Sequence, residues 1–377
     1  MNKKIALSTP HLEGNELEYI QDAFKKNWVT TLGENIDFFE KQLQTYLGEE
    51  KFVTAVNSCT SAIHLSLILL GVKGGDEVIA QSLTFAGSSF PILYQNATPI
   101  FVDSEITTWN MCPNFLEDAI KDRLKKGKKP KAILPVHLYG MPYQVDEIHS
   151  ISKHYEIPVI EDAAEALGSH YKNKKCGTFG DYGTISFNGN KIITTSGGGI
   201  VISNNEESKK EAIHLATQAR DQTDYYQHSK IGFNYRMSNL LAGLGRSQMH
   251  VLDARISKRR ENQKFYRELF QEVDGVTVHN EPNTDYFSNH WLSAIIIDPK
   301  IAGKTREDLR LSFLEDTIES RPLWKPMHLQ PVFANAPYYG GKVAEELFDN
   351  GLCLPSGSNL TDSERERIAK KVKEVFA

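Results

Sequence analysis

Short apolar runs alternate with helical patterns through the first half of the chain, and this alternation limits the fold more than any other feature. Five runs have the length and β-branched content of strands, and helical spacing of apolar residues separates them. Such alternation predicts βαβ units, in which helices cover both faces of a mainly parallel sheet. The expected strands are residues 52–56, 77–80, 99–102, 132–136 and 158–160, and the expected helices between them are residues 60–70, 85–94, 114–126 and 143–155.

Polar side chains collect where these expected strands end. In an open α/β sheet, ligands bind beyond the carboxyl ends of the strands, where the next helix begins. The segments at these positions are rich in hydroxyl, aromatic or ionisable side chains, so we expect a binding site there. They are Asn57-Ser-Cys-Thr-Ser-Ala62, Ser82-Leu-Thr-Phe-Ala86, His137-Leu-Tyr-Gly140 and Glu161-Asp-Ala-Ala-Glu165.

A lysine stands at a glycine-rich corner farther along the chain. An expected strand at residues 184–187 is followed by Lys191 and then by Gly197-Gly-Gly199, which opens a second strand. A lysine in a turn is usually solvated. These flanking strands are too apolar for a surface ribbon, however, and glycines let the backbone approach a ligand or adopt positive φ. A lysine amine in a desolvated corner can lose its proton and attack a carbonyl, as Schiff-base lysines do.

The regions outside this core indicate a second, smaller unit. Two amphipathic helices precede the first strand, and a helix over residues 205–220 and a long amphipathic pattern from residue 240 follow the corner. The composition then becomes mixed, with a strand at 291–297, a helix near 305–315 and a closing helix from 361. A chain of 377 residues suits two or three domains. We predict a large domain over residues 1–255 and a small α+β domain over residues 256–377.

Charge and cysteine usage argue against several functions. The net charge of -5 gives no basic excess, so nucleic-acid binding lacks electrostatic support. The locally basic residues 121–131 end a helical pattern and are interpreted as a solvated face. The 4 cysteines have no paired spacing, so we expect reduced thiols and no metal site. No signal-peptide pattern and no run of about 18 apolar residues is present, which predicts no membrane segment and a cytoplasmic location.

Four groups at the strand ends together match the needs of one cofactor. Thr60 and Ser61 open a helix whose free amides suit a phosphate, although an ordinary N-cap explains them equally well. Asp162 either caps a helix or faces a ligand cation, and Phe85 either packs in the core or stacks on a flat ring. Lys191 follows Asp162 by 191 − 162 = 29 residues. Pyridoxal phosphate requires such a set: amides for its phosphate, an acid for its ring nitrogen and an amine for its aldehyde.

Three longer motifs carry a resemblance to a known family. Glu161-Asp-Ala-Ala-Glu-Ala-Leu-Gly168, Ser186-Phe-Asn-Gly-Asn-Lys191 and Gly232-Phe-Asn-Tyr-Arg-Met-Ser238 resemble the DegT/DnrJ/EryC1/StrS sugar aminotransferases, which are pyridoxal phosphate enzymes of fold type I. The resemblance covers nearly the whole chain. The sequences around Lys191 and at Arg321-Pro-Leu-Trp-Lys-Pro-Met-His328 are most similar to those of the UDP-4-keto-sugar 4-aminotransferases of the bacillosamine pathway.

The resemblance implies a role for each cofactor residue. Lys191 would be the Schiff-base and proton-transfer residue, and Asp162 would be the partner of the pyridinium nitrogen. Glu165 stands where many members have Gln or His, so it would lie near the phenolic oxygen of the cofactor or contact the sugar amine. In the remaining roles, Phe85 would cover the ring, Thr60, Ser61 and Ser186 would hold the phosphate, and Asn234 would complete the phosphate site from the neighbouring subunit of an obligate homodimer.

The polar loops would select the sugar. A structural ion pair remains open for Arg236, and a purely structural loop position remains open for His328. The expected sugar contacts are Trp28, Thr30 and Thr31, and the expected nucleotide diphosphate contacts are Tyr235, Arg236, Lys325 and His328.

The expected reaction moves an amino group from L-glutamate to the C4 ketone of a nucleotide-linked 4-keto-6-deoxy sugar. UDP-2-acetamido-2,6-dideoxy-4-ketohexose is the expected substrate, for surface glycan or glycoprotein biosynthesis. Amination of a dTDP-keto sugar at C3 or C4 is the first alternative. Dehydrating members of the family usually replace the lysine by histidine, so Lys191 argues against dehydration. A non-catalytic regulator that binds pyridoxal phosphate is the distant alternative.

Overall fold

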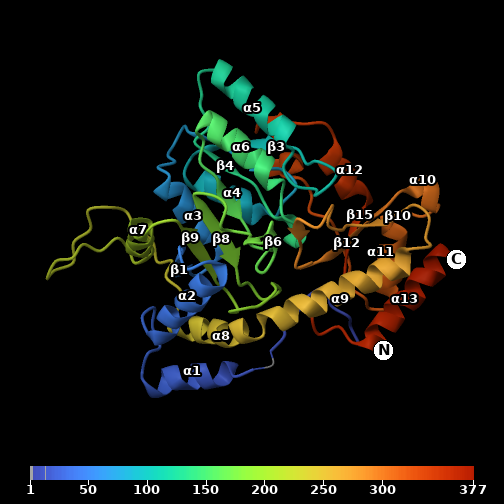
Figure 1. Cartoon of the computed structure of the whole chain (residues 1–377), viewed down its shortest axis with the longest axis horizontal. Coiled ribbons are helices and arrows are strands. Elements are labelled where there is room, and N and C mark those ends of the chain that lie inside the picture. Colours follow the sequence, from blue (N-terminus) through green and yellow to red (C-terminus); the bar gives the residue numbers. More distant parts are fainter. Residues whose placement is uncertain (1–2, 13) are drawn as a thin grey trace.

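A twisted sheet with helices on both sides forms the larger part of the molecule in a computed structural model that describes residues 3–12 and 14–377 (Figure 1). Two runs of paired strands, β1-β9-β8-β5 and β4-β2-β3-β14, meet through parallel bridges of Ile133 with Val159 and Val136 with Asp162. The strands are β1 (Phe52–Val56), β2 (Glu77–Gln81), β3 (Thr98–Val102), β4 (Ala132–Leu134), β5 (Ile160–Asp162), β8 (Tyr182–Ser186), β9 (Gly199–Ser203) and β14 (Tyr338–Tyr339).

Neighbouring strands of this sheet are parallel except where β9 is inserted. β5 runs parallel to β8, and β2 runs parallel to β3 and β4. β9 is antiparallel to both β1 and β8, because the connection over residues 187–198 brings the chain back beside β8 without the helix that usually forms a parallel crossover. The predicted mainly parallel sheet is therefore confirmed.

Side chains alternate between the two faces of the sheet, and each face is buried. Val201 of β9 packs into one core cluster, whereas Ile200 and Ile202 pack into another on the opposite face. β2 follows the same pattern, with Val78 on one face and Ile79 on the other. The covering helices are α3 (Cys59–Leu69), α4 (Ala86–Tyr94) and α7 (Glu206–Ala216) on the first face, and α2 (Glu34–Leu47), α5 (Pro113–Lys125), α6 (Val145–Tyr155) and α8 (Asn239–His250) on the second.

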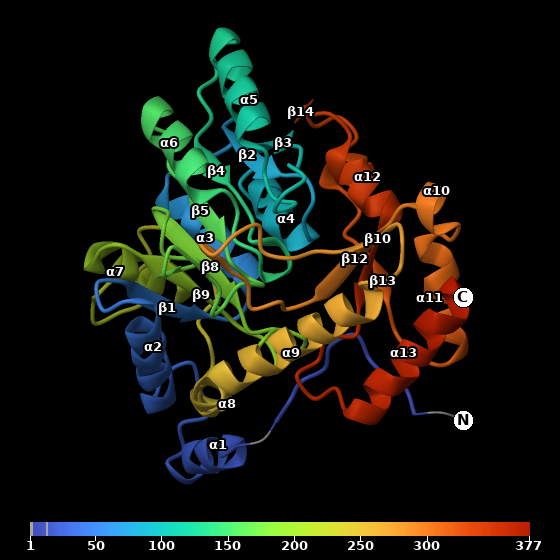
Figure 2. The ribbon, with the colours of Figure 1, turned by 45° about the vertical axis from the view of Figure 1, so that its right-hand side comes forward.

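A second sheet, antiparallel throughout, forms the smaller part (Figure 2). Helix α9 (Leu252–Phe270) runs without interruption from the large part into the small one, across the predicted boundary after residue 255. The division at that position remains a prediction. The elements of this part are β10 (Val276–Val278), β12 (Ser293–Ile297), β13 (Arg321–Pro322), β15 (Gly351–Leu354), α10 (Pro299–Ala302), α11 (Arg306–Glu315), α12 (Val343–Asn350) and α13 (Asp362–Phe376).

Shorter elements complete the larger part and join it to the smaller one. Helix α1 (Glu16–Lys25) packs against α8, and β11 (Tyr286–Phe287) pairs with β6 (His170–Tyr171), which in turn pairs with β7 (Lys174–Lys175).

The predicted helix 205–220 ends earlier, at Ala216, because residues 217–219 turn back toward Phe233. The long pattern from residue 240 forms two helices, α8 and α9, with Val251 between them.

The N-terminal segment joins the small part instead of the large one. Ile5 forms a parallel bridge with Ile318, and Leu7 accepts a hydrogen bond from the Ser356 amide at 2.8 Å. Ser8 then donates through Oγ to the Asn190 carbonyl at 2.8 Å, directly before Lys191. Residues near both ends of the chain thus meet beside the glycine-rich corner.

Within residues 3–12 and 14–377, no helix is long and apolar enough to cross a membrane. The same residues contain no group of three or more His, Cys, Asp or Glu side chains that could hold a metal ion.

Candidate active site

A cavity of about 380 Å³ lies at the carboxyl ends of β1, β2, β5 and β8. Three of the four predicted strand-end segments contribute to its wall, at residues 57–60, 84–85 and 162–165. The fourth, at 137–140, lies behind the wall, where the Tyr139 amide donates to Glu165 at 2.7 Å. The structure thus brings the predicted polar segments to one place, as the parallel strand order requires.

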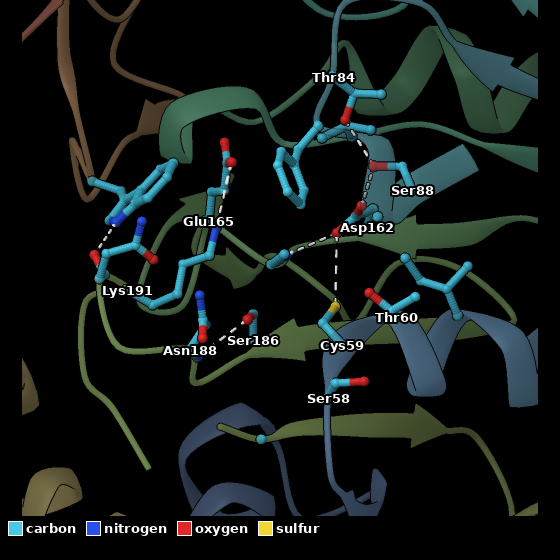
Figure 3. A pocket seen from close by; sticks show the side chains of 18 of the residues that line it. Ser58, Cys59, Thr60, Thr84, Ser88, Asp162, Glu165, Ser186, Asn188 and Lys191 are labelled. Carbon is cyan, nitrogen blue, oxygen red and sulfur yellow. Dashed lines mark hydrogen bonds and ion pairs between the residues drawn. The ribbon is translucent and has the colours of Figure 1, made fainter. Parts of the chain in front are cut away.

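Lys191 enters the cavity from the turn after β8 (Figure 3). Its amide donates to the Asn188 carbonyl, which closes the turn, and only 12% of its side chain is exposed. Nζ lies 3.4 Å from Oε1 of Glu165 and 3.8 Å from the centroid of the Trp291 ring. The lysine is therefore not the solvated turn residue that its position alone suggests.

Asp162 faces the cavity from the opposite side, at the end of β5 (Figure 3). Oδ2 accepts a hydrogen bond from Ser88 at 2.6 Å, and Ser88 in turn lies 2.7 Å from the Thr84 hydroxyl. Oδ1 accepts the Ala164 amide at 3.0 Å. These contacts fix a buried carboxylate in one orientation, so it opposes Lys191 across the cavity.

The start of α3 supplies free backbone donors. Ser58 is the N-cap and accepts the Ser61 amide at 3.0 Å, which corrects the expectation that the Ser61 amide is free. Among residues 3–12 and 14–377, the Cys59 and Thr60 amides have no hydrogen-bond acceptor. Free amides and the helix dipole attract anions, so the Cys59 and Thr60 amides form an anion-binding position at this helix end, whereas the Ser61 amide is taken by the Ser58 cap.

Two of the three glycines after Lys191, Gly198 and Gly199, serve close packing, and none of the three has a positive φ. Gly197, Gly198 and Gly199 are absent from the described residues with positive φ, whereas Ser196 has φ 69°. A Cβ atom on Gly199 would lie 2.5 Å from the Cys59 amide nitrogen, and the backbone there cannot move away. This glycine therefore lets β9 begin directly against the start of α3.

The side chain of Phe85 is too exposed for a core residue and is available for contact with a ligand. It lines the cavity with 58% of its surface exposed, and its ring centroid lies 5.5 Å from that of Trp324. An exposed ring beside a cavity offers a face for stacking.

Two buried glutamates near the cavity differ in their electrostatics. Burial would raise the pKa of the Glu161 carboxyl, but hydrogen bonds from His137 and the Gly180 amide outweigh it and hold the pKa below its ordinary value. Burial raises the pKa of the Glu165 carboxyl above its ordinary value, against the opposing charge of Lys191 and the Tyr139 amide.

Glutamine substitutions at these two positions should change stability with pH in opposite directions. A lowered pKa contributes stability that is lost as the pH falls through it, and a raised pKa contributes stability that is lost as the pH rises. The free energy of unfolding of Glu161→Gln should lie about 3 kcal/mol below wild type at neutral pH, with a smaller deficit below about pH 4. Glu165→Gln should gain on wild type as the pH rises. Urea unfolding from about pH 4 to about pH 8 measures both, and parallel curves for the two variants would contradict the assignment.

Several predicted residues do not line the cavity of the single chain. Arg236 is buried, with Nη1 2.5 Å from Glu40 and 2.9 Å from the Ala55 carbonyl, as expected for a structural ion pair. His328 stacks on Tyr338 and its Nδ1 lies 2.7 Å from the Ser82 hydroxyl. The residues inside are Thr60, Phe85, Asp162, Glu165, Ser186 and Lys191, and those outside are Trp28, Thr30, Thr31, Ser61, Asn234, Tyr235, Arg236, Lys325 and His328.

Sequence reasoning missed several cavity residues. Trp324 directly precedes Lys325 in the loop Arg321–His328, whose sequence predicts nucleotide contacts, so a local signal for Trp324 exists. Ser88 lies four residues after Thr84, at helical spacing from a strand-end segment. Trp291 had no such signal, because it was assigned to a strand. The cavity residues without an individual predicted role include Ser58, Thr84, Ser88, Asn188, Asn190, Trp291 and Trp324, although Ser58 and Thr84 lie in predicted strand-end segments.

These residues fit pyridoxal phosphate. The free amides of Cys59 and Thr60 and the Ser186 hydroxyl can donate hydrogen bonds to a phosphate, and the exposed Phe85 ring lines the same cavity. Asp162 offers a carboxylate and Lys191 offers an amine across the same cavity. This donor set is the one that the cofactor requires.

The comparisons with known proteins agree with this fit. The Bacillus subtilis protein named "Putative pyridoxal phosphate-dependent aminotransferase EpsN" is 48% identical over 380 residues, which cover 100% of this chain and 97% of the relative. The GDP-perosamine synthase of Escherichia coli O157:H7 is 36% identical over 375 residues, covering 100% and 99%. A DegT DnrJ EryC1 StrS aminotransferase from Brucella abortus has a crystal structure that matches with a TM-score of 0.88 at 26% identity, covering 96% of this chain and 95% of that one.

The fold and the cavity thus define a pyridoxal phosphate-dependent enzyme of fold type I. The model of the DegT/DnrJ/EryC1/StrS aminotransferase family matches residues 10–373. The chain belongs to this family and is a sugar aminotransferase.

Proposed function

We propose that the enzyme transfers an amino group from L-glutamate to the C4 ketone of a nucleotide-linked 4-keto-6-deoxy sugar, with UDP-2-acetamido-2,6-dideoxy-4-ketohexose as substrate, for surface glycan or glycoprotein biosynthesis. One observation carries the proposal: Lys191 and Asp162 face each other across one cavity. A lysine at this place supports amino transfer over dehydration and over a non-catalytic regulator. The loop motif at residues 321–328, which resembles the UDP-4-keto-sugar enzymes, supports the choice of sugar.

Each cavity residue has a task in this proposal. When bound, pyridoxal phosphate supplies the electron sink that lets an amino group leave one carbon and join another. Lys191 would hold the cofactor aldehyde through Nζ, and its free amine would move a proton to and from the substrate carbon. Asp162 keeps a proton on the ring nitrogen, and its bonds to Ser88 and Ala164 prevent it from turning away.

The remaining residues hold and shield the cofactor. The Cys59 and Thr60 amides and the Ser186 hydroxyl bind the phosphate, in a site that the positive end of α3 favours. Phe85 covers one ring face and excludes water from it. Glu165, fixed by the Tyr139 amide, lies beside the amine of Lys191 and receives a hydrogen bond from it.

We also propose a homodimer with shared active sites. The loop after α7 extends away from the body of the chain (Figure 1), and its Tyr226 and Ile231 are 81% and 86% exposed. Trp28, Thr30 and Asn234 are exposed too, although the family resemblance gives them substrate or cofactor contacts. A second copy would cover this apolar surface and complete the site. Sedimentation should give twice the chain mass of 42.5 kDa, and a monomer with full activity would contradict the proposal.

The sugar nucleotide is the part of the proposal that most needs a direct test. The 36% identical relative is a GDP-perosamine synthase, so GDP sugars join dTDP sugars as competing substrates. Purified enzyme should be incubated with glutamate and matched 4-keto and 3-keto sugars linked to UDP, dTDP and GDP. We expect amination of the UDP-4-keto sugar with the highest kcat/KM, and NMR of the product gives the stereochemistry. Preference for a GDP or dTDP sugar, or for a 3-keto sugar, would overturn the choice of substrate.

We place the enzyme in the cytoplasm. All four cysteines of the chain are free and buried, as suits a reducing compartment. The proposed nucleotide-sugar substrate fits the same location.

A further inference from the structure

Trp291 is far from Lys191 in the sequence but contacts it in the structure. It lies two residues before β12, and only 1% of its surface is exposed. Its Nε1–H donates to the Asn190 carbonyl at 2.7 Å, so the indole edge holds the residue before the lysine. Its face lies below the lysine amine, with Nζ 3.8 Å from the ring centroid. One side chain therefore holds both the turn and the tip of Lys191.

The indole is itself locked on its backbone side. The Trp291 amide donates to Oδ1 of Asn289 at 2.8 Å. Asn289 is fully buried and uses Nδ2 to donate to the carbonyls of Glu165 and Leu167, each at 2.9 Å. Glu165 is the other partner of the lysine amine. Asn289 thus fixes the main chain of Glu165 relative to the indole, and the Tyr139 amide holds its carboxylate at 2.7 Å.

Arg259 of α9 closes this set of contacts. Nη1 donates to the Trp291 carbonyl at 2.5 Å, and Nη2 lies within 3.4 Å of the Lys191 carbonyl and 3.0 Å of Ser8 Oγ. The Ser356 carbonyl is a further acceptor, so the partners of this guanidinium in the described chain are neutral oxygens. Burial, helped by the nearby Arg255, lowers the pKa of Arg259 to about 9. Burying a charged guanidinium without a carboxylate partner is unfavourable. Its hydrogen bonds to the Lys191 and Trp291 carbonyls indicate that Arg259 fixes the main chain at these two residues.

We propose that Trp291 is a positioning residue that keeps the free amine of Lys191 directed into the cavity, between the indole face and Glu165, with Arg259 and Asn289 holding the indole in place. A cation is attracted to the face of an indole ring, and the attraction is larger where water is excluded. When the lysine is not bound to the cofactor, this contact restricts the directions that its flexible side chain can take. The inference rests on the proposed role of Lys191 as the cofactor lysine.

The position of the amine can be tested without the cofactor. An aromatic ring shifts the NMR signals of nuclei above its face upfield, so cofactor-free protein carrying [ε-¹³C]lysine should show one upfield signal that Lys191→Ala removes. Trp291→Leu should remove the upfield shift, whereas Trp291→Phe should keep part of it because a ring face remains. Trp324→Leu is the matched control, since Trp324 lines the same cavity but its ring packs beside Phe85 and Tyr139. An unchanged lysine signal in Trp291→Leu would overturn the proposal.

The effect on function is measured as the rate at which cofactor-free enzyme captures pyridoxal phosphate, followed by absorbance. We expect capture by Trp291→Leu to be about 10-fold slower and by Trp291→Phe less than about threefold slower. Equal slowing in Trp291→Leu and Trp324→Leu would indicate general damage to the cavity and would also overturn the proposal. If Trp291→Leu does not fold, as judged by circular dichroism, Trp291→Phe carries both tests. Capture by wild type that Lys191→Ala does not abolish would instead reject the role of Lys191 itself, so the two failures are distinguishable.

Discussion

Replacing Lys191 by alanine is expected to lower transaminase turnover at least about 10⁴-fold, because the change removes both the covalent attachment point and the proton carrier. No other described amine lines the cavity and could take over, since Lys191 is its only lysine in the part of the chain that the structure covers. Single-turnover kinetics with glutamate measure the loss in each half-reaction. The absorbance band of the lysine-bound cofactor should disappear as well.

Two controls make this result specific. Lys191→Arg keeps a positive charge opposite Glu165 but cannot form the covalent bond, so it should be as inactive as the alanine variant. Lys210→Ala removes an exposed lysine of α7, whose side chain is 69% exposed, and should retain wild-type turnover. Full turnover in Lys191→Ala, with its absorbance band intact, would reject the mechanism.

The second large effect is expected at Asp162. Asparagine has nearly the same shape and can still accept the Ala164 amide, but it carries no charge to hold a proton on the ring nitrogen. We expect kcat to fall on the order of 10³-fold, with a much smaller change in KM for the sugar. The matched control is Asp118→Asn, which removes one carboxylate from the exposed side of α5. A loss of affinity for the sugar with unchanged kcat would place Asp162 in sugar binding instead.

The sheet was predictable because its signal is local. Each strand buries both faces, so its residues form short apolar runs, and the intervening helices show apolar spacing of their own. The same local signal predicts that Lys191, Asp162 and Phe85 lie in one site, since parallel order brings the carboxyl ends of the strands to one edge. For Thr60 the pattern identified the helix end, although only the structure shows that Ser61 gives its amide to the cap.

What the pattern could not predict depends on contacts between distant residues. Arg259 lies in a charged run that suggests a solvated helix, yet it is 1% exposed, because carbonyls from three remote segments surround it. Trp291 belongs to the apolar run of β12 by composition, and nothing local separates a cavity residue from a core residue there. Trp28 and Asn234 are exposed in the single chain, and under the proposed homodimer their contacts would come from a second copy, which no pattern within one chain specifies.

The docking of the N-terminal segment has a consequence for biosynthesis of the enzyme. Ile5, Leu7 and Ser8 leave the ribosome first, but their partners at Ile318 and Ser356 are among the last residues made. Nearly the whole polypeptide must be synthesised before the segment beside Lys191 can take its final position. Translation of Lys191 itself therefore does not complete the catalytic corner, because the corner, like the edge strand β14 of the large sheet, depends on residues that are made near the end of synthesis.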